Sequence, residues 1–161
     1  MAKKTTIVVD GANLAYEEMT GDGKPKVSNL VAARQALEQR GYAPIIIVDA
    51  ALRHAIDDPD QLEALFDAQV VRQAPAGTDA DFFVLETADN EGARVVSNDQ
   101  FDPYQDKFPW IRDRRVPFMI VRGAVEFYKD VLSDGSGDGV GPSGEDHSRF
   151  RTWKEDLHRA D

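Results

Sequence analysis

The chain has 161 residues, no cysteine and a formal net charge of −10. This length fits one domain with a single good core, and the absence of cysteine excludes disulfides and thiolate zinc sites. The acidic balance argues against a general nucleic-acid coat protein. No apolar run could span a bilayer, and no hydrophobic signal region follows Met1, so we expect a soluble, cytoplasmic protein without a membrane partner.

Short apolar runs alternate with helical patterns over the first 130 residues. A helix-compatible segment follows the first run, and further helices are predicted from Ser28 or Asn29 to Arg40, from residues 57–60 onward, and from Asp79 to about Ala88. Residues 102–115 look irregular or briefly helical. Strands are predicted at residues 5–9, 44–48, 70–71, 95–97 and 117–121. The alternation predicts a three-layer α/β/α domain with a mostly parallel five-stranded sheet, spanning residues 1–130.

The composition changes after Leu132. Residues 133–148 contain five of the 12 glycines and almost nothing apolar, which predicts a disordered acidic linker over residues 131–148. In residues 149–161, Phe150, Trp153 and Leu157 have the spacing of a short amphipathic helix. Docking of this helix on the domain or on a second copy is favoured over a partner-binding or RNA-contacting tail. The second reading stays open because the segment is basic, with Arg149, Arg151, Lys154 and Arg159.

Two predicted strands lead into acidic residues at one edge of the sheet. Asp10 ends the first strand and Asp99 follows the fourth, and open α/β sheets bind ligands at this edge. Further carboxylates are available near the helix entry at 79–81 and just past the fourth strand. Each alone would be an ordinary cap or turn former, but together they would repel unless a cation such as Mg²⁺ or Mn²⁺ lay among them. The candidate metal ligands are Asp10, Asp79, Asp81, Asp99 and Asp102.

Such a cluster suits displacement at a phosphodiester by metal-activated water. No side-chain nucleophile is needed, in agreement with the absence of cysteine and of a convincing Ser-His-Asp set. Phe101, Tyr104 and Trp110 are available for base stacking, although core packing is preferred for Trp110. The candidates for contact with the phosphate backbone are Arg34, Arg53, Lys107, Arg112, Arg114 and Arg115.

Three motifs in order carry a family resemblance: Val-Val-Asp10-Gly-Ala-Asn13, the acidic entry at 78–81, and Val-Val-Ser97-Asn98-Asp99 followed by another Asp. The combination resembles the NYN branch of PIN-like ribonucleases, especially the animal CCCH zinc-finger ribonucleases of the Regnase type, over residues 5–128. The resemblance implies a parallel sheet flanked by helices, a Mg²⁺ pocket and endonucleolytic cleavage of single-stranded RNA. It also makes a homodimer plausible, because PIN-like domains often pair. The catalytic residues that it implies are Asp10, Asn13, Asp79, Asp99 and Asp102.

The chain departs from this family pattern in several places. Ala80 separates two acids that are commonly adjacent, and residues two apart on a helix do not share a face, so Asp79 is preferred to Asp81. Asp102 stands one position early, with Pro103 in the usual place, which makes Asp106 a substitute. Ala12 replaces a frequent serine, and no zinc finger accompanies the domain, so substrate choice is expected to come from the groove, the tail or a partner.

Three alternatives remain at this stage. The first is a catalytically weak RNA-binding or regulatory module of the same fold, suggested by the altered helix entry and the acidic surface. The second keeps the enzyme but changes its substrate to DNA, because no residue pattern reads a 2′-hydroxyl. The third, a phospho-Asp receiver domain, is weaker: Asp49 ends a strand suitably, but Val121 is followed by Arg122 instead of the supporting lysine.

Overall fold

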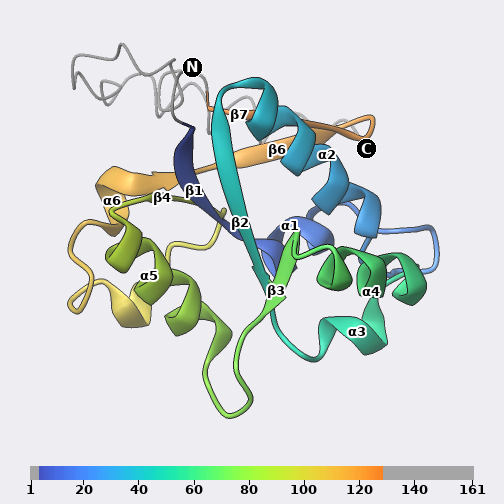
Figure 1. Ribbon diagram of the computed structural model, residues 1–161, viewed down its shortest axis with the longest axis horizontal. Helices are drawn as coiled ribbons and strands as arrows, with labels where there is room; N and C mark the ends of the chain where they lie inside the picture. The colour runs from blue at the N-terminus through green and yellow to red at the C-terminus, as the bar shows by residue number, and fades with distance from the viewer. Residues whose placement is uncertain (1–3, 129–161) are drawn as a thin grey trace.

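Five short runs rich in β-branched residues pair in parallel to form the central sheet, seen in a computed structural model that describes residues 4–128 (Figure 1). The strand order is β3-β2-β1-β4-β5. The first strand therefore lies beside the fourth, as predicted, and the carboxyl ends of β1, β2 and β3 point downward in Figure 1. The strands are β1 Thr5–Asp10, β2 Tyr42–Val48, β3 Val71–Gln73, β4 Arg94–Val96 and β5 Arg115–Val116.

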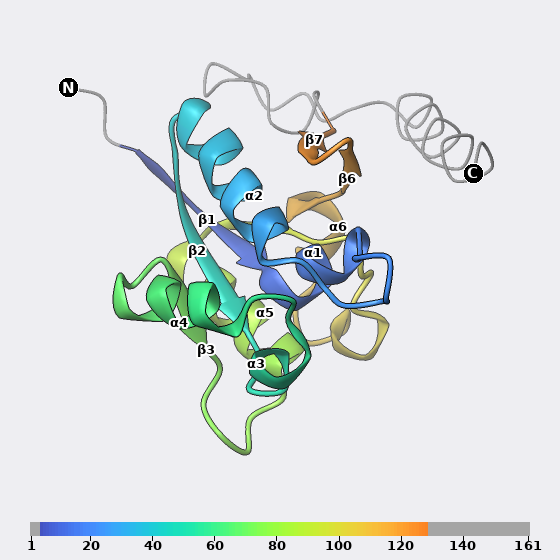
Figure 2. The ribbon, with the colours of Figure 1, turned by 90° about the vertical axis from the view of Figure 1, so that its right-hand side faces the viewer.

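Side chains of the central strands alternate between two hydrophobic cores. Ile7 and Val9 of β1 pack on one face of the sheet, whereas Val8 packs on the other. Figures 1 and 2 show the two helical layers on opposite faces. This arrangement confirms the predicted three-layer fold. The first layer holds α1 Gly11–Glu17, α2 Val27–Gln39, α3 Leu52–Ala55 and α4 Pro59–Asp67; the second holds α5 Ala80–Glu91, the 3₁₀ helix η1 Asp102–Tyr104 and α6 Ile111–Arg114.

The start of α2 differs from the prediction. Neither Ser28 nor Asn29 caps it, because the helix already begins at Val27. The Val27 amide instead donates to Asp57 Oδ1 at 2.9 Å, from a residue 30 positions away in the chain. Asn29 is buried, and its side-chain amide donates to the carbonyls of Leu14, Ala15 and Glu18. Asn29 therefore satisfies the open carbonyls at the end of α1.

Other helices keep their predicted positions with shifted ends. Asp58 caps α4 by accepting from the Gln61 amide at 3.1 Å. The α5 helix continues three residues beyond the predicted end, to a left-handed Gly92 with φ of 62°. Its buried residues are Val84, Leu85 and Ala88, whereas Phe82 and Phe83, predicted on the buried face, are only half-buried. The four-residue α3 was not predicted.

The last predicted strand, at residues 117–121, is wrong as part of the parallel sheet. Strand β5 is Arg115–Val116 and ends before Pro117, which has no N–H for a further ladder bond. The following residues form an antiparallel hairpin of β6 Phe118–Val121 and β7 Ala124–Phe127. Its turn residues Arg122 and Gly123 both have positive φ, 52° and 79°, as a type I′ turn requires. Arginine is an unusual residue for that position, which is why the turn was missed.

The other strands begin close to their predicted positions. β2 starts two residues early, at Tyr42, and its first half is only half-buried rather than buried on both faces. The predicted linker at 131–148 and the amphipathic segment at 149–161 lie outside the described residues. Within residues 4–128, no helix has the length and apolar character needed to cross a bilayer.

The hydrogen bonds from Asn29 to the end of α1 give a stability prediction. Asn29→Ala should lower the free energy of unfolding by about 2–4 kcal/mol, because it removes three hydrogen bonds from a buried side chain to the end of α1. Ser28→Ala is the matched control, since Ser28 is exposed and caps nothing; it should change stability by less than about 0.5 kcal/mol. Urea denaturation of both variants measures the difference, and equal losses would contradict the assignment.

Candidate functional site

The carboxyl edge of the sheet gathers acidic side chains because of strand alternation. Asp10 continues the register of Val8, which faces α5, and residue 49 continues that of Ile47 on the neighbouring strand. The first turn of α5 carries Asp81. The strand ends and the start of α5 therefore bring carboxylates from three elements to one side of the sheet.

Asp10 is the centre of this arrangement. Its carboxylate is 6% exposed; it accepts from the Ser97 hydroxyl at 2.8 Å and from the Asn13 amide at 3.4 Å. The pKa of Asp10 is raised to about 6, mainly by burial and also by the nearby charges of Asp81 and Asp99, while the two hydrogen bonds oppose the shift. The site thus holds a carboxyl group that titrates near neutral pH.

Ser97 links Asp10 to the loop after β4. It is fully buried, and its hydroxyl oxygen accepts from the Asp99 amide at 3.0 Å. The Asp99 carboxylate in turn accepts from the Phe101 amide at 2.8 Å, which holds the loop in a tight turn. In the sequence, Ser97 stands out only as part of a motif. The feature that could have predicted its role is that Ser97 and Asp10 directly follow the paired residues Val96 and Val9 on neighbouring strands.

Asn13 joins α1 to the same loop. Its side-chain oxygen accepts from the Asn98 amide at 3.0 Å. The Asn98 side-chain oxygen accepts from the Phe118 amide at 3.0 Å, so the loop is also tied to the start of β6. The first motif and the Ser-Asn-Asp motif, 85 residues apart, are therefore in direct contact.

Of the two acids at the start of α5, Asp81 is among the charges that act on Asp10, whereas Asp79 is not. Burial, and then the charges of Asp99, Asp79 and Asp49, raise the pKa of Asp81. Asp79 caps α5 by accepting from the Asp81 amide at 3.0 Å, and its other oxygen accepts from the Tyr104 hydroxyl. Asp79 lies just outside the helix in extended conformation, so the rule for residues two apart on a helix does not decide between the two. Asp81 acts on Asp10 and Asp79 acts on Asp81, so the preference for Asp79 as a metal ligand stays a prediction.

Asp102 and Asp106 are not brought into this group. Asp102 is exposed on η1, where its carboxylate accepts from the Gln105 side chain at 3.1 Å, and neither residue is among the charges that act on Asp10 or Asp81. Asp49, considered only for a receiver domain, does act on Asp81 and also caps α3 through the Leu52 amide at 2.9 Å. Its position directly after a buried strand, like that of Asp10, is the sequence feature that could have predicted its place near the other acids.

The acids form an open rim. Within residues 4–128, no three acidic or histidine side chains are grouped as ligands of a single metal ion. Carboxylates that share such a rim still favour a cation, because the neighbouring acids raise the pKa of Asp10 and of Asp81. Mg²⁺ commonly binds proteins through one or two carboxylates and keeps several waters, so this donor set fits Mg²⁺ without a closed cage.

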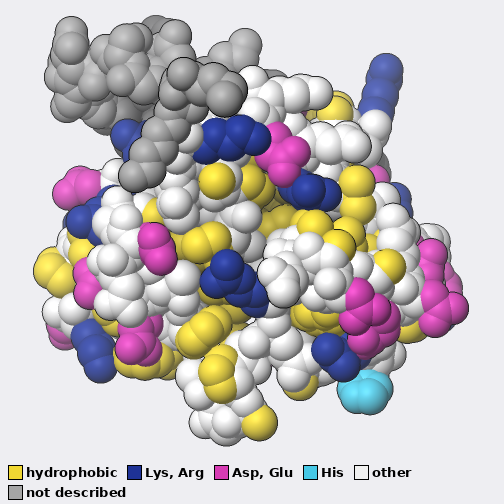
Figure 3. Space-filling view, in the orientation of Figure 1, with side chains coloured by type: hydrophobic (Ala, Val, Ile, Leu, Met, Phe, Trp, Pro, Cys, Tyr) yellow, Lys and Arg dark blue, Asp and Glu magenta, His cyan; other side chains and the backbone are white. Residues whose placement is uncertain are grey.

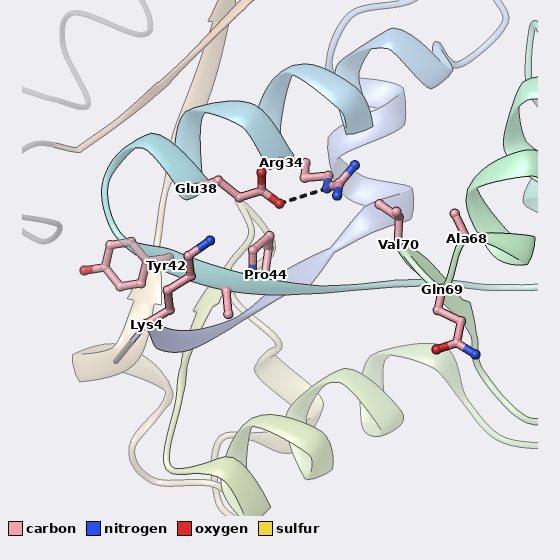
Figure 4. A pocket seen from close by; sticks show the side chains of 9 residues that line it. Lys4, Arg34, Glu38, Tyr42, Pro44, Ala68, Gln69 and Val70 are labelled. Atoms are coloured by element: carbon pink, nitrogen blue, oxygen red, sulfur yellow. Dashed lines mark hydrogen bonds and ion pairs between the residues drawn. The ribbon is translucent and has the colours of Figure 1, made fainter. Parts of the chain in front are cut away.

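The predicted phosphate-binding residues are spread over the molecule. Arg34 lies at the opposite edge of the sheet, beside a pocket of about 220 Å³ lined by the starts of β1 and β2, and it pairs with Glu38 at 2.9 Å (Figure 4). Arg53 pairs with Glu63 at 3.2 Å and covers the Phe66 ring. On the face in Figure 3, Lys and Arg side chains are interleaved with acidic ones and form no continuous basic patch.

The remaining basic candidates lie on or near the second helical layer. Arg115 is tied to the site, because it donates to the carbonyl of Ser97, the residue whose hydroxyl donates to Asp10, at 3.1 Å. Lys107 lies over the Phe82 ring at 4.5 Å, and Arg114 over the Trp110 ring at 4.8 Å. Arg112 is exposed on α6. The structure therefore brings Arg115 to the site and separates Arg34 from it.

The aromatic candidates are engaged within the protein. Phe101 is 1% exposed. The Trp110 ring packs on Phe108 and its indole N–H donates to Asp89 at 2.8 Å, in line with the preference for core packing. Tyr104 packs on Phe82 and donates to Asp79.

Two solved structures of the nuclear protein-only RNase P 2 (PRORP2) from Arabidopsis thaliana share this fold. One is 22% identical with a TM-score of 0.59, and it covers 77% of this chain and 29% of PRORP2. The other is 20% identical with a TM-score of 0.60, and it covers 78% and 30% respectively. The chain thus spans about three tenths of PRORP2, and the likeness at this identity concerns the fold. No curated protein matches the chain.

The family match covers most of the sequence. Residues 3–138 match the family described as the Zc3h12a-like Ribonuclease NYN domain. The match includes all three motifs of the carboxyl edge, and it confirms the resemblance that these motifs carry. The chain belongs to the Zc3h12a-like ribonuclease NYN domain family.

Proposed function

We propose that this protein is a divalent-metal-dependent endoribonuclease that hydrolyses phosphodiester bonds of single-stranded RNA. The observation that carries the proposal is the meeting of Asp10, Asp81 and Asp99 at the carboxyl edge of the sheet, where the charges of Asp81 and Asp99 act on Asp10 and that of Asp99 also acts on Asp81. Membership of a ribonuclease family supports the substrate class. The homodimer and the cytoplasmic location expected from the sequence stay predictions.

Asp10, Asp81 and Asp99 would hold Mg²⁺ or Mn²⁺. A bound ion of this kind lowers the pKa of a water molecule and neutralises charge on a phosphate. Ser97 orients Asp10 through its hydroxyl, and Asn13 keeps the loop that carries Asp99 in place through the Asn98 amide. Arg115, which is hydrogen-bonded to the Ser97 carbonyl, would supply a cation for a phosphate.

A catalytically weak RNA-binding module of the same fold is the second candidate. The open rim favours it, since no three acids within residues 4–128 form a ready metal site. Such a module would retain RNA in a salt-sensitive manner without metal-dependent products. An assay that measures both retention and cleavage of RNA distinguishes the two candidate functions.

Purified protein should cleave an end-labelled single-stranded RNA with Mg²⁺ or Mn²⁺ but not with EDTA, and should leave 3′-hydroxyl and 5′-phosphate ends, because water is the nucleophile. Asp10→Asn, Asp81→Asn and Asp99→Asn should each lower kcat by at least about 100-fold, a loss typical of removing transition-state electrostatic stabilisation. Asp102→Asn should lower it by less than about 5-fold, because its carboxylate lies outside the group.

Asp67→Asn, an exposed acid at the end of α4, is the matched control and should cleave like the wild type. Cleavage that survives in EDTA would refute metal dependence. Binding of RNA without cleavage would show that the protein is the RNA-binding module and not the nuclease. A larger loss of kcat for Asp102→Asn than for Asp81→Asn would show that Asp102, a catalytic residue predicted from the sequence, contributes more than Asp81.

Asp10 also predicts a pH dependence of stability. Its pKa is raised from 3.8 to about 6 in the folded protein, so the folded state binds the proton more tightly and stability falls as pH rises from about 4 to above 6. At 1.36 kcal/mol per pKa unit, the ionised group costs about 3 kcal/mol at pH 7.5. Part of this cost is already present at pH 4, where the unfolded carboxyl is more than half ionised. Relative to the wild type, Asp10→Asn should therefore gain about 2 kcal/mol in free energy of unfolding between pH 4 and pH 7.5, measured by urea denaturation in EDTA.

Urea denaturation with Mg²⁺ in place of EDTA tests metal binding without an activity assay. Mg²⁺ should stabilise the wild type at pH 7.5 by binding the folded state, and should stabilise Asp10→Asn less. Asp67→Asn should follow the wild type throughout. An unchanged difference between Asp10→Asn and the wild type at the two pH values would show that Asp10 has an ordinary pKa.

A further inference from the structure

Tyr16 and Met19 are the two large hydrophobic residues that are exposed in the described region, at 46% and 49%. Both follow Asp10 closely in the chain, on α1 and in the loop after it (Figure 2). A single exposed hydrophobic side chain is ordinary. Two of them on the one segment that starts at the acidic rim suggest a surface that contacts a ligand.

The rotation of α1 is fixed at both ends. A Cβ atom on Gly11 would lie 2.6 Å from Val48 Cγ1 and 2.8 Å from the Ile47 carbonyl, so only glycine lets the first turn approach β2 this closely. At the other end, the buried Asn29 amide holds the Leu14 and Ala15 carbonyls. The helix is therefore a rigid element, which positions a binding side chain better than a loop does.

This rotation places Tyr16 on the same side of α1 as Asn13. Gly11, Leu14 and Ala15 form the buried side, whereas Asn13 and Tyr16 are three positions apart and thus neighbours on the helix surface. Asn13 contacts the loop that carries Asp99 through the Asn98 amide. Tyr16 consequently lies one helical turn, about 5 Å along the axis, beyond Asn13.

The Tyr16 ring is available to a ligand. Among residues 4–128 it takes part in no aromatic pair, cation–π contact or hydrogen bond. By contrast, Phe101, Tyr104 and Trp110 pack against other side chains or make hydrogen bonds within the protein. Tyr16 is thus a free aromatic ring on the helix that Asp10 caps.

We propose that Tyr16 is a stacking platform for a base of single-stranded RNA, one that positions the neighbouring phosphate at the acidic rim. The proposal rests on the proposed endoribonuclease function for its ligand class. Every base has a π-face, so stacking would accept any base. A base in a duplex is already stacked on its neighbours, so the platform would favour unpaired RNA. Tyr16 acts as a substrate-binding residue in this proposal, and it takes no part in the chemical step.

The test compares Tyr16→Leu, which removes the ring but keeps an apolar side chain, with Tyr16→Phe, which keeps the ring. Tyr42→Leu is the matched control, because Tyr42 lies at the opposite edge of the sheet. Binding of a fluorescent single-stranded RNA is measured by anisotropy in EDTA, and cleavage is measured with Mg²⁺. Tyr16→Leu should raise Kd and KM by about 5- to 100-fold, the range for one stacked base, with kcat changed less than about 2-fold. Tyr16→Phe and Tyr42→Leu should behave like the wild type.

A series of RNAs with one abasic nucleotide at successive positions adds a coupling test. At one position the missing base should weaken binding by the wild type as much as Tyr16→Leu does, and should cost the variant nothing further. Equal Kd values for Tyr16→Leu and the wild type would overturn the proposal, as would an absence of RNA binding by the wild type. Binding that depends on Tyr16 without any cleavage would support the stacking platform while refuting the endoribonuclease function.

Discussion

The hydrogen bond between the Ser97 hydroxyl and the Asp10 carboxylate is the contact on which the site depends. It joins two neighbouring strands at their carboxyl ends, and the pairing of Val9 with Val96 brings its partners to the same level. Successive residues of a strand point to opposite faces, so a slip of one residue would direct Asp10 into the other core. The same hydroxyl accepts from the Asp99 amide, and one buried side chain thereby orients two acids.

The cost of this arrangement is electrostatic. Asp10 is buried beside other acids, and burial and repulsion raise its pKa, whereas its hydrogen bonds from Ser97 and Asn13 lower it. Folded domains rarely bury a carboxyl group among like charges without a functional reason, and strongly perturbed pKa values gather at functional sites. A divalent cation would remove the repulsion, which makes the destabilising feature of the free protein a favourable feature of the metal-bound one.

The helix α1 connects the chemistry to substrate recognition. It begins at Asp10, carries Asn13 toward the loop after β4, and presents Tyr16 to solvent one turn later. Its position depends on contacts from outside the helix: the close approach of Gly11 to β2 and the three hydrogen bonds from Asn29. Recognition and catalysis are therefore held by the same packing, and disturbing α2 would disturb both.

The sequence by itself determined the parallel sheet and the meeting of Asp10 and Asp99 at one edge, because apolar periodicity is local and the handedness of crossovers constrains the topology. Only the tertiary structure decided which polar groups meet. Asp57 accepts from the first amide of α2 although it lies 30 residues away in the chain. Asn29, which resembles a cap in the sequence, is buried and donates to a carbonyl of α1 instead. Asp81 acts on Asp10, whereas Asp79 caps α5 and acts on Asp81, and Tyr16 is exposed on a helix whose approach to β2 depends on Gly11. A short polar residue suits several local roles equally well, and the partner that selects one of them comes from a distant part of the chain.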